Sequence, residues 1–525
     1  MSAREFRLHF TETLMSDAVP HSLILQASYA TVGSMIADRA RATPDRPALR
    51  SRRDASSFSR LDQRANALAH ALMDFGVAHG DRVAILSENR SEFIEATVAA
   101  AKIGAILACQ NWRLALPELQ HCLTLVEPKL ILVSERFREQ MDELDLAKTR
   151  VLFFGADYEA CLAGAPTAAP SVDVDPEDGL LILYTSGTTG LPKGALISHR
   201  AEVARATGAR ADFGLALGDT FVCWTPMFHM GGMDLALMTL LGGGEVIIED
   251  GYDATRLADI AIREPIGWLV VIPGMVESFI EEMRRRGQPP AGVKLCGVMA
   301  DLVPGHQLAE ITRLLDAPYA NTFGSTETGS LPAAGPTVPI GMIPESLTKF
   351  PSPNCEIRLV DEDDNDVAPG TPGELAIRGP TLFSGYWRAD ETNAHDFRGG
   401  WFHNGDLLVR DRDGGFNFVD RVKYMIKSGG ENIYPAEIER VLLSEPRVTE
   451  AAVVRRRDDR WGEVPIAYVA RSDDTLDADA LAKLCRANLA GFKQPKEIRF
   501  LDHDAFPRNV SGKVLRHDLE ALIDE

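Results

Sequence analysis

The segment Leu181–Gly194, LILYTSGTTGLPKG, constrains the fold of this chain more than any other part of the sequence. An apolar run typical of a buried strand passes directly into a loop of glycines and hydroxyl side chains that ends in Pro-Lys-Gly. Glycines let backbone N–H groups approach an anion closely, hydroxyls add donors, and a lysine adds positive charge. A flexible polar turn needs only two or three such residues, and the spacing does not match a Walker loop. The sequence therefore predicts a different phosphate-binding loop, made of Thr185, Ser186, Gly187, Thr188, Thr189, Gly190 and Lys193.

Helical and strand patterns alternate on both sides of this loop. Over the first 180 residues, and again from Ala201 to Phe323, apolar residues three and four apart alternate with short apolar runs. This alternation favours crossover connections and parallel sheets, so we expect an α/β fold with two such subdomains. The expected elements include helices over Leu61–Phe75 and Glu92–Ile106 and strands over Val83–Leu86 and Trp268–Ile272.

The C-terminal part of the sequence has a different pattern. From about Pro353, turn-forming pairs such as Pro369-Gly370 follow one another at close spacing, which predicts a β-rich subdomain over residues 353–421. The last hundred residues mix helix and strand and begin with a proline-led helix over Pro435–Leu443.

Composition excludes several classes of partner. The 525 residues carry 55 Lys and Arg against 76 Asp and Glu, a formal net charge of −21. Such a chain is poorly suited to neutralise nucleic-acid phosphates or anionic lipid, so neither is expected as a partner. The seven scattered cysteines form no CxxC pair, which indicates reduced thiols rather than disulfides or a zinc site. No signal-peptide pattern and no long apolar run is present, so we expect a cytoplasmic protein without a membrane span.

Four further motifs follow the phosphate loop at intervals along the chain. They are TFGSTE at Thr322–Glu327, WFHNGD at Trp401–Asp406, DRVKYMIKSGGENI at Asp420–Ile433, and PRNVSGKVLR at Pro507–Arg516. With the loop, these motifs resemble in order and spacing the adenylate-forming superfamily, which includes acyl-CoA synthetases, adenylation domains of peptide synthetases and beetle luciferases. The resemblance covers nearly the whole chain.

This resemblance implies an architecture and a reaction. It implies a large N-terminal AMP-binding domain, residues 1–421, of two parallel α/β subdomains plus the β-rich subdomain. A small mobile α+β domain, residues 422–525, would follow. The implied activity is that of an acid–thiol ligase using ATP, Mg²⁺ and coenzyme A. A carboxylate and ATP would form an acyl-adenylate and pyrophosphate, and coenzyme A would then take the acyl group as a thioester.

The motif TFGSTE is expected to contact the nucleotide. Phe323 offers a flat face for a purine, Gly324 allows close backbone approach, and Thr326 and Glu327 offer oxygen ligands for Mg²⁺. As an isolated pentapeptide, FGSTE fits equally well a strand-to-helix turn with an N-terminal cap. The resemblance favours nucleotide binding, includes Ser325 among the contacts, and implies Thr185 and Glu327 as metal ligands.

Two later motifs supply the other nucleotide contacts that the resemblance implies. A carboxylate at Asp406 can accept two hydrogen bonds from a vicinal diol, as the family does with the ribose of ATP, and Arg421 matches the second ribose contact. The alternative for Arg421 is an arginine on a surface strand. Asn404 stands where relatives often have Thr. Lys427 is expected near the phosphates, and Lys423 at the hinge between the domains.

Lys513, in Ser511-Gly512-Lys513, matches the catalytic lysine of the family. An isolated lysine near a C-terminus is usually a solvated surface charge. A lysine that touches both the attacking carboxylate and the α-phosphate would reduce their repulsion and stabilise charge in the transition state. In relatives, rotation of the small domain replaces this lysine with a glycine-containing loop beside the coenzyme A tunnel, matched here by Ser428, Gly429 and Gly430.

His229, in FHMGGM, indicates the branch of the family. Adenylation domains for amino acids usually carry an Asp here for the ammonium group, whereas acyl- and aryl-CoA synthetases carry a histidine that flanks the carboxylate site. Taken alone, the residue could be a core histidine. Val298 and Met299 stand where relatives commonly have small residues, so we expect a narrow cavity for a short, medium-length or compact cyclic or aromatic acid. The expected pocket residues are Trp224, Met233, Trp268, Val298, Met299 and Ser330.

Two other functions remain open at this stage. One is a stand-alone acyl-adenylating enzyme that loads a carrier protein instead of coenzyme A. The other is a non-catalytic nucleotide-binding protein, against which Lys513, Glu327 and the complete loop argue. The expected partners are small molecules, and a homodimer is left open.

Overall fold

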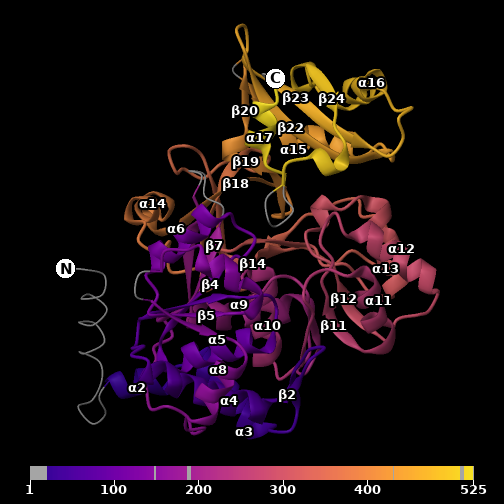
Figure 1. Ribbon diagram of the computed structural model, residues 1–525. Helices are drawn as coiled ribbons and strands as arrows, with labels where there is room; N and C mark the ends of the chain where they lie inside the picture. Colours follow the sequence, from indigo (N-terminus) through magenta and orange to yellow (C-terminus); the bar gives the residue numbers. More distant parts are fainter. Residues whose placement is uncertain (1–20, 147–148, 186–190, 430, 509–513, 524–525) are drawn as a thin grey trace. The chain divides into compact units, whose positions relative to one another are not determined.

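The computed structural model describes residues 21–146, 149–185, 191–429, 431–508 and 514–523. The chain forms two compact units (Figure 1). The first extends to Tyr252 and also includes Ser325–Ser330 and Pro380–Ala389, and the second contains Asp253–Gly324, Leu331–Gly379 and the chain from Asp390 onward.

A six-stranded sheet forms the centre of the first unit, in the order β6-β5-β3-β4-β7-β8. All neighbouring strands are parallel except β7 and β8, which are antiparallel and close the sheet. Val83–Leu86 is buried in β3, as a parallel strand covered on both faces requires. The strands are β3 (Arg82–Leu86), β4 (Ile106–Gln110), β5 (Leu130–Val133), β6 (Arg150–Phe153), β7 (Gly179–Thr185) and β8 (Lys193–Ser198).

Helices alternate with these strands, as the apolar spacing predicts. The helix expected over Leu61–Phe75 is α4 (Phe58–Asp74), and Ser57 caps it by accepting the N–H of Arg60. The other α-helices of the unit are α2 (His21–Ala27), α3 (Val32–Ala42), α5 (Ser91–Ile103), α6 (Leu116–Val126), α7 (Arg138–Asp142), α8 (Ala156–Ala163), α9 (His199–Phe213) and α10 (Met230–Leu241).

The helix expected over Glu92–Ile106 is shorter than predicted. It ends at Ile103 because Gly104 adopts a left-handed conformation, with φ of 65°, and caps the helix. Residues Ile106–Gln110 then form β4. This strand was not predicted, because the apolar pattern continues from the helix into it without a break.

A second set of strands in this unit contains β1 (Pro47–Arg50), β2 (Ala55–Ser57), β9 (Phe221–Cys223) and β10 (Val246–Ile248). The pairs β9–β10 and β10–β1 are parallel, and β1–β2 is an antiparallel hairpin.

The second unit begins with two parallel strands and their helices. The strand expected over Trp268–Ile272 starts two residues earlier and ends at Leu269, where the carbonyl of Leu269 accepts the N–H of Gly297. These elements are α11 (Ala254–Arg263), β11 (Ile266–Leu269), α12 (Val276–Arg286), β12 (Val293–Cys296) and α13 (Gly305–Leu315).

An antiparallel meander follows, as the close spacing of turn signals predicts. Its order is β16-β17-β18-β19, with β16 (Glu356–Val360), β17 (Pro372–Arg378), β18 (Phe402–Arg410) and β19 (Phe416–Arg421). Short strands β13 (Thr322–Ser325), β14 (Gly329–Ala334) and β15 (Phe350–Pro351) precede it, and α14 (Asp390–Asp396) lies between β17 and β18.

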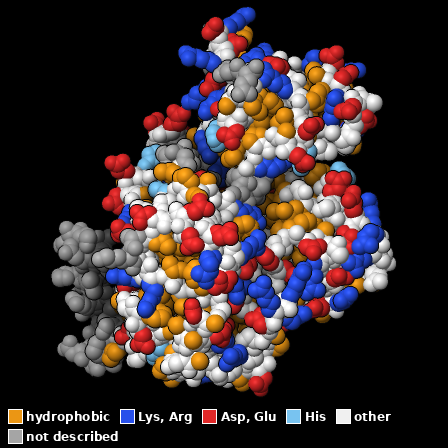
Figure 2. All heavy atoms as spheres, in the orientation of Figure 1, with side chains coloured by type: hydrophobic (Ala, Val, Ile, Leu, Met, Phe, Trp, Pro, Cys, Tyr) orange, Lys and Arg blue, Asp and Glu red, His pale blue; other side chains and the backbone are white. Residues whose placement is uncertain are grey.

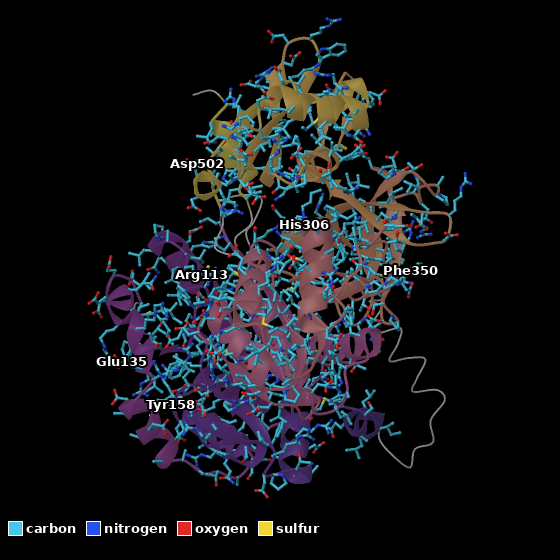
Figure 3. The ribbon with its side chains drawn as sticks, turned by 90° about the vertical axis from the view of Figure 1, so that its right-hand side faces the viewer. Arg113, Glu135, Tyr158, His306, Phe350 and Asp502 are labelled. Carbon is cyan, nitrogen blue, oxygen red and sulfur yellow. The ribbon has the colours of Figure 1, made fainter. Side chains whose placement is uncertain are left out.

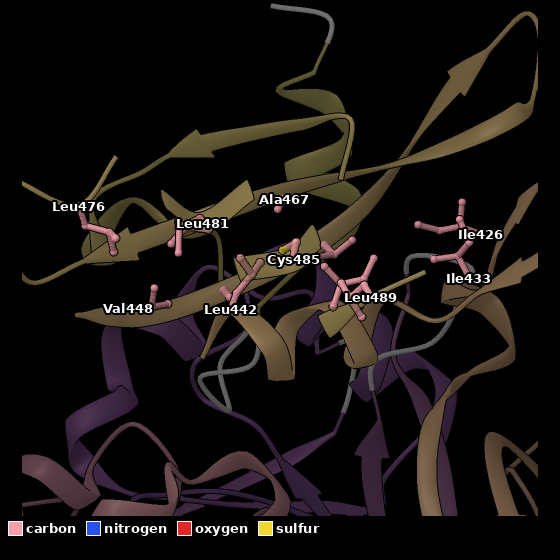
Figure 4. Close-up of a cluster of buried hydrophobic side chains, with 13 residues drawn as sticks. Ile426, Ile433, Leu442, Val448, Ala467, Leu476, Leu481, Cys485 and Leu489 are labelled. Atoms are coloured by element: carbon pink, nitrogen blue, oxygen red, sulfur yellow. The ribbon is translucent and has the colours of Figure 1, made fainter. Parts of the chain in front are cut away.

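Beyond residue 422 the chain forms a mixed α+β arrangement with its own apolar core (Figure 4). The core residues lie between Ile426 and Leu489, on both helices and strands. The strand order is β21-β20-β23-β22, and β24 joins β23 in parallel. The elements are β20 (Ile426–Ser428), β21 (Glu431–Ile433), α15 (Pro435–Leu442), β22 (Val448–Asp458), β23 (Gly462–Arg471), α16 (Ala478–Asn488), β24 (Glu497–Phe500) and α17 (Arg516–Ala521).

The fold therefore belongs to the predicted class, with parallel α/β sheets, an antiparallel meander and an α+β C-terminal region. Among the described residues, no helix is both long and apolar enough to cross a membrane. Acidic and basic side chains are interspersed over the face seen in Figure 2.

Replacing a leucine of the central sheet should destabilise the first unit. Leu86 is 1% exposed, so Leu86→Ala is expected to lower the free energy of unfolding by about 2–5 kcal/mol. Leu217→Ala is the matched control, because Leu217 is 69% exposed and its loss should change stability by less than about 0.5 kcal/mol. Urea unfolding followed by circular dichroism measures both, and equal midpoints would contradict the assignment of β3 to the core.

Candidate active site

The predicted phosphate loop connects β7 to β8 in an antiparallel hairpin. Thr185 and Lys193 are cross-strand partners at its base, and both side chains are half-buried. The hairpin thus holds the two ends of the loop opposite each other, whatever the path of the residues between them. Lys193 is followed by Gly194, whose carbonyl accepts the N–H of Trp387 at 2.7 Å.

Tyr386 connects two residues that the sequence singled out separately. The Nζ of Lys193 lies 4.4 Å from the centroid of the Tyr386 ring, and the Tyr386 hydroxyl donates to Oε1 of Glu327 at 2.8 Å. The Lys193 ammonium group lies over the ring, and the Glu327 carboxylate accepts from the phenol hydroxyl. One positive and one negative group therefore contact the same tyrosine. Tyr386 was not predicted from the sequence, because a tyrosine in Ser384-Gly385-Tyr386 carries no recognisable motif.

The loop that carries Glu327 is held by its own backbone and hydroxyl groups. The N–H of Ser325 donates to Oγ1 of Thr328 at 2.9 Å, and the carbonyl of Glu327 accepts the N–H of Phe383 at 2.9 Å. Thr326 is buried. The strand-to-helix turn left open by the sequence is wrong, because β13 ends in a turn that leads directly into β14, and this turn presents the Glu327 carboxylate.

His229 forms the N-cap of α10. Its Nδ1 accepts the N–H of Gly231 at 3.1 Å, so the proton of the neutral ring is on Nε2. The ring is half-buried, which excludes a fully enclosed core histidine. Two predicted pocket residues near it in sequence are buried: the Trp224 ring lies edge-on to Tyr252, with centroids 5.2 Å apart, and Met233 is 0% exposed.

In the second unit, Asp406 and Arg421 are cross-strand partners on β18 and β19. The Nε of Arg421 lies 2.7 Å from Oδ1 of Asp406, whose carboxylate is buried. Asn404 donates from Nδ2 to Oδ2 of Asp406 at 2.6 Å and accepts the N–H of Asp406 at 3.0 Å. The residue noted as a departure from the family pattern therefore orients the predicted ribose carboxylate.

Phe323 and Gly324 lie at the end of β13 in the second unit. The Phe323 ring is tilted by 41° against Phe418, with centroids 6.2 Å apart, and Gly324 is exposed. The Phe323 ring therefore packs against a second aromatic ring, as expected of a side chain that is held in place to stack on a planar base.

The residues predicted to form the hinge and to contact coenzyme A are mostly exposed. The Nζ of Lys423 lies 4.8 Å from the Tyr424 ring centroid, and that of Lys427 lies 3.6 Å from a carboxylate oxygen of Glu362. Ser428 is buried, and Gly429 donates its N–H to the carbonyl of Trp461 at 2.7 Å.

Long-range ion pairs join the two last motifs. Arg516 donates from one NH2 group to both oxygens of Glu439 at 2.7 Å, and its NH1 lies 3.6 Å from Asp420. The other carboxylate oxygen of Asp420 accepts the N–H of Ala436 at 2.8 Å. Burial raises the pKa of Glu439 above its ordinary value. The segment that follows Lys513 is therefore anchored to α15 and to the end of β19.

The segment that contains Val298 and Met299 is supported from beneath by two aromatic residues. The Trp268 indole donates to the carbonyl of Gly297 at 2.9 Å, and the Tyr319 hydroxyl lies 3.0 Å from the carbonyl of Val298. Met299 has φ of 53°, an unusual left-handed conformation for a methionine. Trp268, predicted as a pocket wall, is 1% exposed and acts here as a support.

Some predicted residues lie outside the described part of the chain, so their positions stay predictions. They are Ser186, Gly187, Thr188, Thr189, Gly190, Gly430 and Lys513. The side chain of Ser330 is likewise not described.

No group of three or more His, Cys, Asp or Glu residues suited to a metal ion occurs among the described residues. Mg²⁺ is commonly held by one or two protein oxygens together with substrate phosphates. Glu327, oriented by Tyr386, offers a hard oxygen of that kind.

Comparison with known proteins identifies close relatives of the chain. The family model described as AMP-binding enzyme matches residues 36–387, and that described as AMP-binding enzyme C-terminal domain matches residues 437–513. An indoleacetate–CoA ligase from Aromatoleum aromaticum is 36% identical over 91% of this chain and 96% of its own length. A feruloyl-CoA synthase from Amycolatopsis is 34% identical over 93% and 98%. The solved O-succinylbenzoate coenzyme A synthetase from Bacillus subtilis, in complex with ATP and magnesium ion, is 27% identical, with a TM-score of 0.80 over 93% of this chain and 99% of that chain.

The Tyr319 ring, which lies against the segment containing Val298 and Met299, should leave no room for a side chain at Gly297. A Cβ there would come within 1.9 Å of the Tyr319 ring, and φ is +66°. Gly297→Ala is expected to cost more than about 2 kcal/mol of stability, because it adds a ring clash to the backbone penalty. Gly274→Ala isolates the backbone penalty, since Gly274 has φ of +82° with nothing within 4 Å, and should cost about 1 kcal/mol. Similar losses in urea unfolding would show that Tyr319 does not press against Gly297.

Proposed function

The chain belongs to the AMP-binding enzyme family and is an AMP-forming acid–CoA ligase, and on that premise we propose that it activates a compact, aromatic or cyclic carboxylic acid. The observation that carries the choice of acid is the 36% identity, over nearly the whole of both chains, to an indoleacetate–CoA ligase. The feruloyl-CoA synthase has a second aromatic acid in its name. Both names fit the bulky residues Val298 and Met299, which would shorten an acyl cavity.

The reaction uses ATP, Mg²⁺ and coenzyme A. In the first half, a carboxylate oxygen of the acid forms a bond to the α-phosphorus of ATP, and the bond between the α- and β-phosphates breaks to release pyrophosphate. In the second half, the thiol sulfur of coenzyme A bonds to the acyl carbon, the carbon–oxygen bond to AMP breaks, and the thiol loses its proton. Mg²⁺ would neutralise charge on the phosphate oxygens.

We assign the described residues to these steps by their chemistry. Thr185 and Lys193, at the base of the hairpin, would hold phosphate oxygens, and Glu327 would supply the metal ligand. Asp406, already oriented by Asn404, would accept the ribose hydroxyls. His229 offers an Nε2–H toward an anion while Nδ1 is occupied, which suits the carboxylate of the acid.

The second half of the reaction would require the small domain to move. We propose that residues 422–525 rotate as a body, with Lys513 serving adenylation and the Ser428–Gly430 loop serving thioester formation. The separate apolar core of residues 426–489 supports this, because a body with its own core can move without unfolding. The boundary between residues 421 and 422, a homodimer and a cytoplasmic location stay predictions from the sequence.

A substrate screen tests the proposed acid. Purified protein with ATP, Mg²⁺ and coenzyme A should release pyrophosphate fastest with aryl or arylacetic acids, and more slowly with fatty acids from C4 to C18. A maximum at C16 or longer would contradict the proposal. Release of AMP that depends on coenzyme A distinguishes the ligase from an enzyme that loads a carrier protein.

Removing the bulk of Met299 should change the preference for the acid. Met299→Gly suits the left-handed backbone, so it should fold, and it should raise kcat/KM for longer acids about tenfold or more relative to the best aryl acid. Met342→Gly is the control, because Met342 is 55% exposed and in the same unit. An unchanged ranking of acids in Met299→Gly would remove Met299 from the pocket.

Lys513→Ala separates the two half-reactions. Adenylation, measured by ATP–pyrophosphate exchange, should fall about 10²–10³-fold, because a cation that stabilises transition-state charge is lost. Thioester formation from supplied acyl-adenylate should stay close to the wild-type rate. Lys483→Ala, an exposed lysine on α16, should leave both rates unchanged. Equal losses in both halves for Lys513→Ala would contradict the assigned role.

A further inference from the structure

A buried arginine, Arg205, lies in the middle of α9 and contacts two distant segments of the first unit. Its Nε donates to the carbonyl of Thr381 at 2.9 Å, and one NH2 group donates to the carbonyl of Thr326 at 3.0 Å. The other lies 3.2 Å from a carboxylate oxygen of Asp234 on α10. The side chain is 4% exposed, so these contacts replace water.

The charge of Arg205 is compensated inside the protein. Glu202, one turn earlier on α9, lies 3.7 Å from the same guanidinium nitrogen that contacts Asp234, and both carboxyl groups are buried. Burial, and then the neighbouring Asp234, raise the pKa of Glu202 well above its ordinary value. Asp234 is the nearer of the two carboxyl groups to this nitrogen, at 3.2 Å, and breaking a buried pair of this kind is costly.

The two carbonyls that Arg205 binds belong to the segments that hold the Glu327–Tyr386 pair. Thr326 immediately precedes Glu327 in the loop 325–330, and Thr381 lies five residues before Tyr386 in the segment 380–389. The same two segments meet directly, through the N–H of Phe383 and the carbonyl of Glu327. Arg205 therefore fixes the backbone on both sides of a hydrogen bond between two functional side chains.

The loop packs closely on this guanidinium. A Cβ at Gly329, which has φ of +76°, would come within 2.7 Å of three atoms of the Arg205 side chain. Only a residue without a side chain lets the loop reach the arginine this closely. A lysine at position 205 would have one nitrogen in place of the planar fork of donors, and could not bind both carbonyls and Asp234 in this geometry.

We propose that Arg205 is a positioning residue for adenylation, which sets the distance and direction of the Glu327 carboxylate by binding the backbone of Thr326 and Thr381 at once. The inference rests on the proposed role of Glu327 in holding Mg²⁺ with the nucleotide. Arg205 itself touches no substrate, and its effect on the reaction passes through Glu327.

Arg205→Lys tests this role, with the Mg²⁺ dependence of the reaction as the readout. At fixed ATP, the Mg²⁺ concentration for half-maximal ATP–pyrophosphate exchange should rise about fivefold or more, and the exchange rate should fall about tenfold or more. Thioester formation from supplied acyl-adenylate should stay within about twofold of wild type. A merely structural arginine would lower thermal stability and scale both half-reactions together.

Arg64 provides the matched control, because it is a second poorly exposed arginine in the same unit. It lies on α4, 15% exposed, and donates to Glu159 at 2.9 Å. The centroid of the Tyr158 ring lies 5.9 Å from its guanidinium carbon. Tyr158 is labelled in Figure 3. Arg64→Lys should lower the melting temperature without changing the half-maximal Mg²⁺ concentration. If both lysine variants shift the Mg²⁺ dependence equally, Arg205 has no special role.

Two further variants keep the inference separable from the proposed function. Should Arg205→Lys fail to fold, Asp234→Asn retains the shape of the side chain and should shift the Mg²⁺ dependence in the same direction. Glu327→Gln should raise the half-maximal Mg²⁺ concentration at least as much as Arg205→Lys. A normal Mg²⁺ dependence in Glu327→Gln would overturn the assigned metal ligand, whereas a shift there with none in Arg205→Lys or Asp234→Asn would overturn only the role of Arg205.

Discussion

The antiparallel pair β7–β8 at the edge of an otherwise parallel sheet is the constraint that positions the predicted nucleotide-binding residues of the first unit. Between β7 and β8 the chain must reverse direction, so Thr185 and Lys193 become cross-strand partners. The outer edge of β8 then pairs with the segment after residue 380: the N–H of Leu196 donates to the carbonyl of Gly385, and Trp387 donates back to Gly194. These backbone bonds bring Tyr386 next to Lys193. The predicted phosphate loop and the segment that holds the Glu327 carboxylate thus share the strand β8.

The buried Arg205 likewise joins segments of this unit that are far apart in the sequence. A guanidinium has five donors in one plane, so Arg205 can bind two carbonyls and a carboxylate that come from three parts of the chain. Its cost of desolvation is offset only while all three partners stay in place. These contacts hold the backbone of the loop around Glu327, which lies between two strands and has no helix of its own. In the second unit, the Asp406 carboxylate is held by a residue close in sequence. Asn404 lies two residues before it on the same strand and donates a hydrogen bond to it.

Several features were predictable because they depend on local pattern. The apolar runs and their spacing identified β3, β7, α4 and α15 to within a few residues, and the turn pairs identified the meander of β16–β19. The predicted boundaries were wrong where the conformation of a single residue ends an element. Gly104 ends α5 at Ile103, three residues before the end of the predicted helix. The polar motifs predicted Lys193, Glu327, Asp406 and Arg421 as nucleotide contacts, since each stands in a run of residue types that few structures without a nucleotide require, and these roles stay predictions.

The sequence by itself determined the family, the class of fold and the chemistry available at the nucleotide, because these follow from residue types at fixed short spacing. Only the tertiary structure decided which groups orient that chemistry. Tyr386 lies 59 residues from Glu327, Arg205 lies 121 residues from Thr326, and Trp268 binds the carbonyl of a glycine 29 residues away. The first of these contacts depends on strand register, and the other two end on backbone carbonyls. Every residue has a carbonyl, so no pattern of side chains announces which one a buried donor will find.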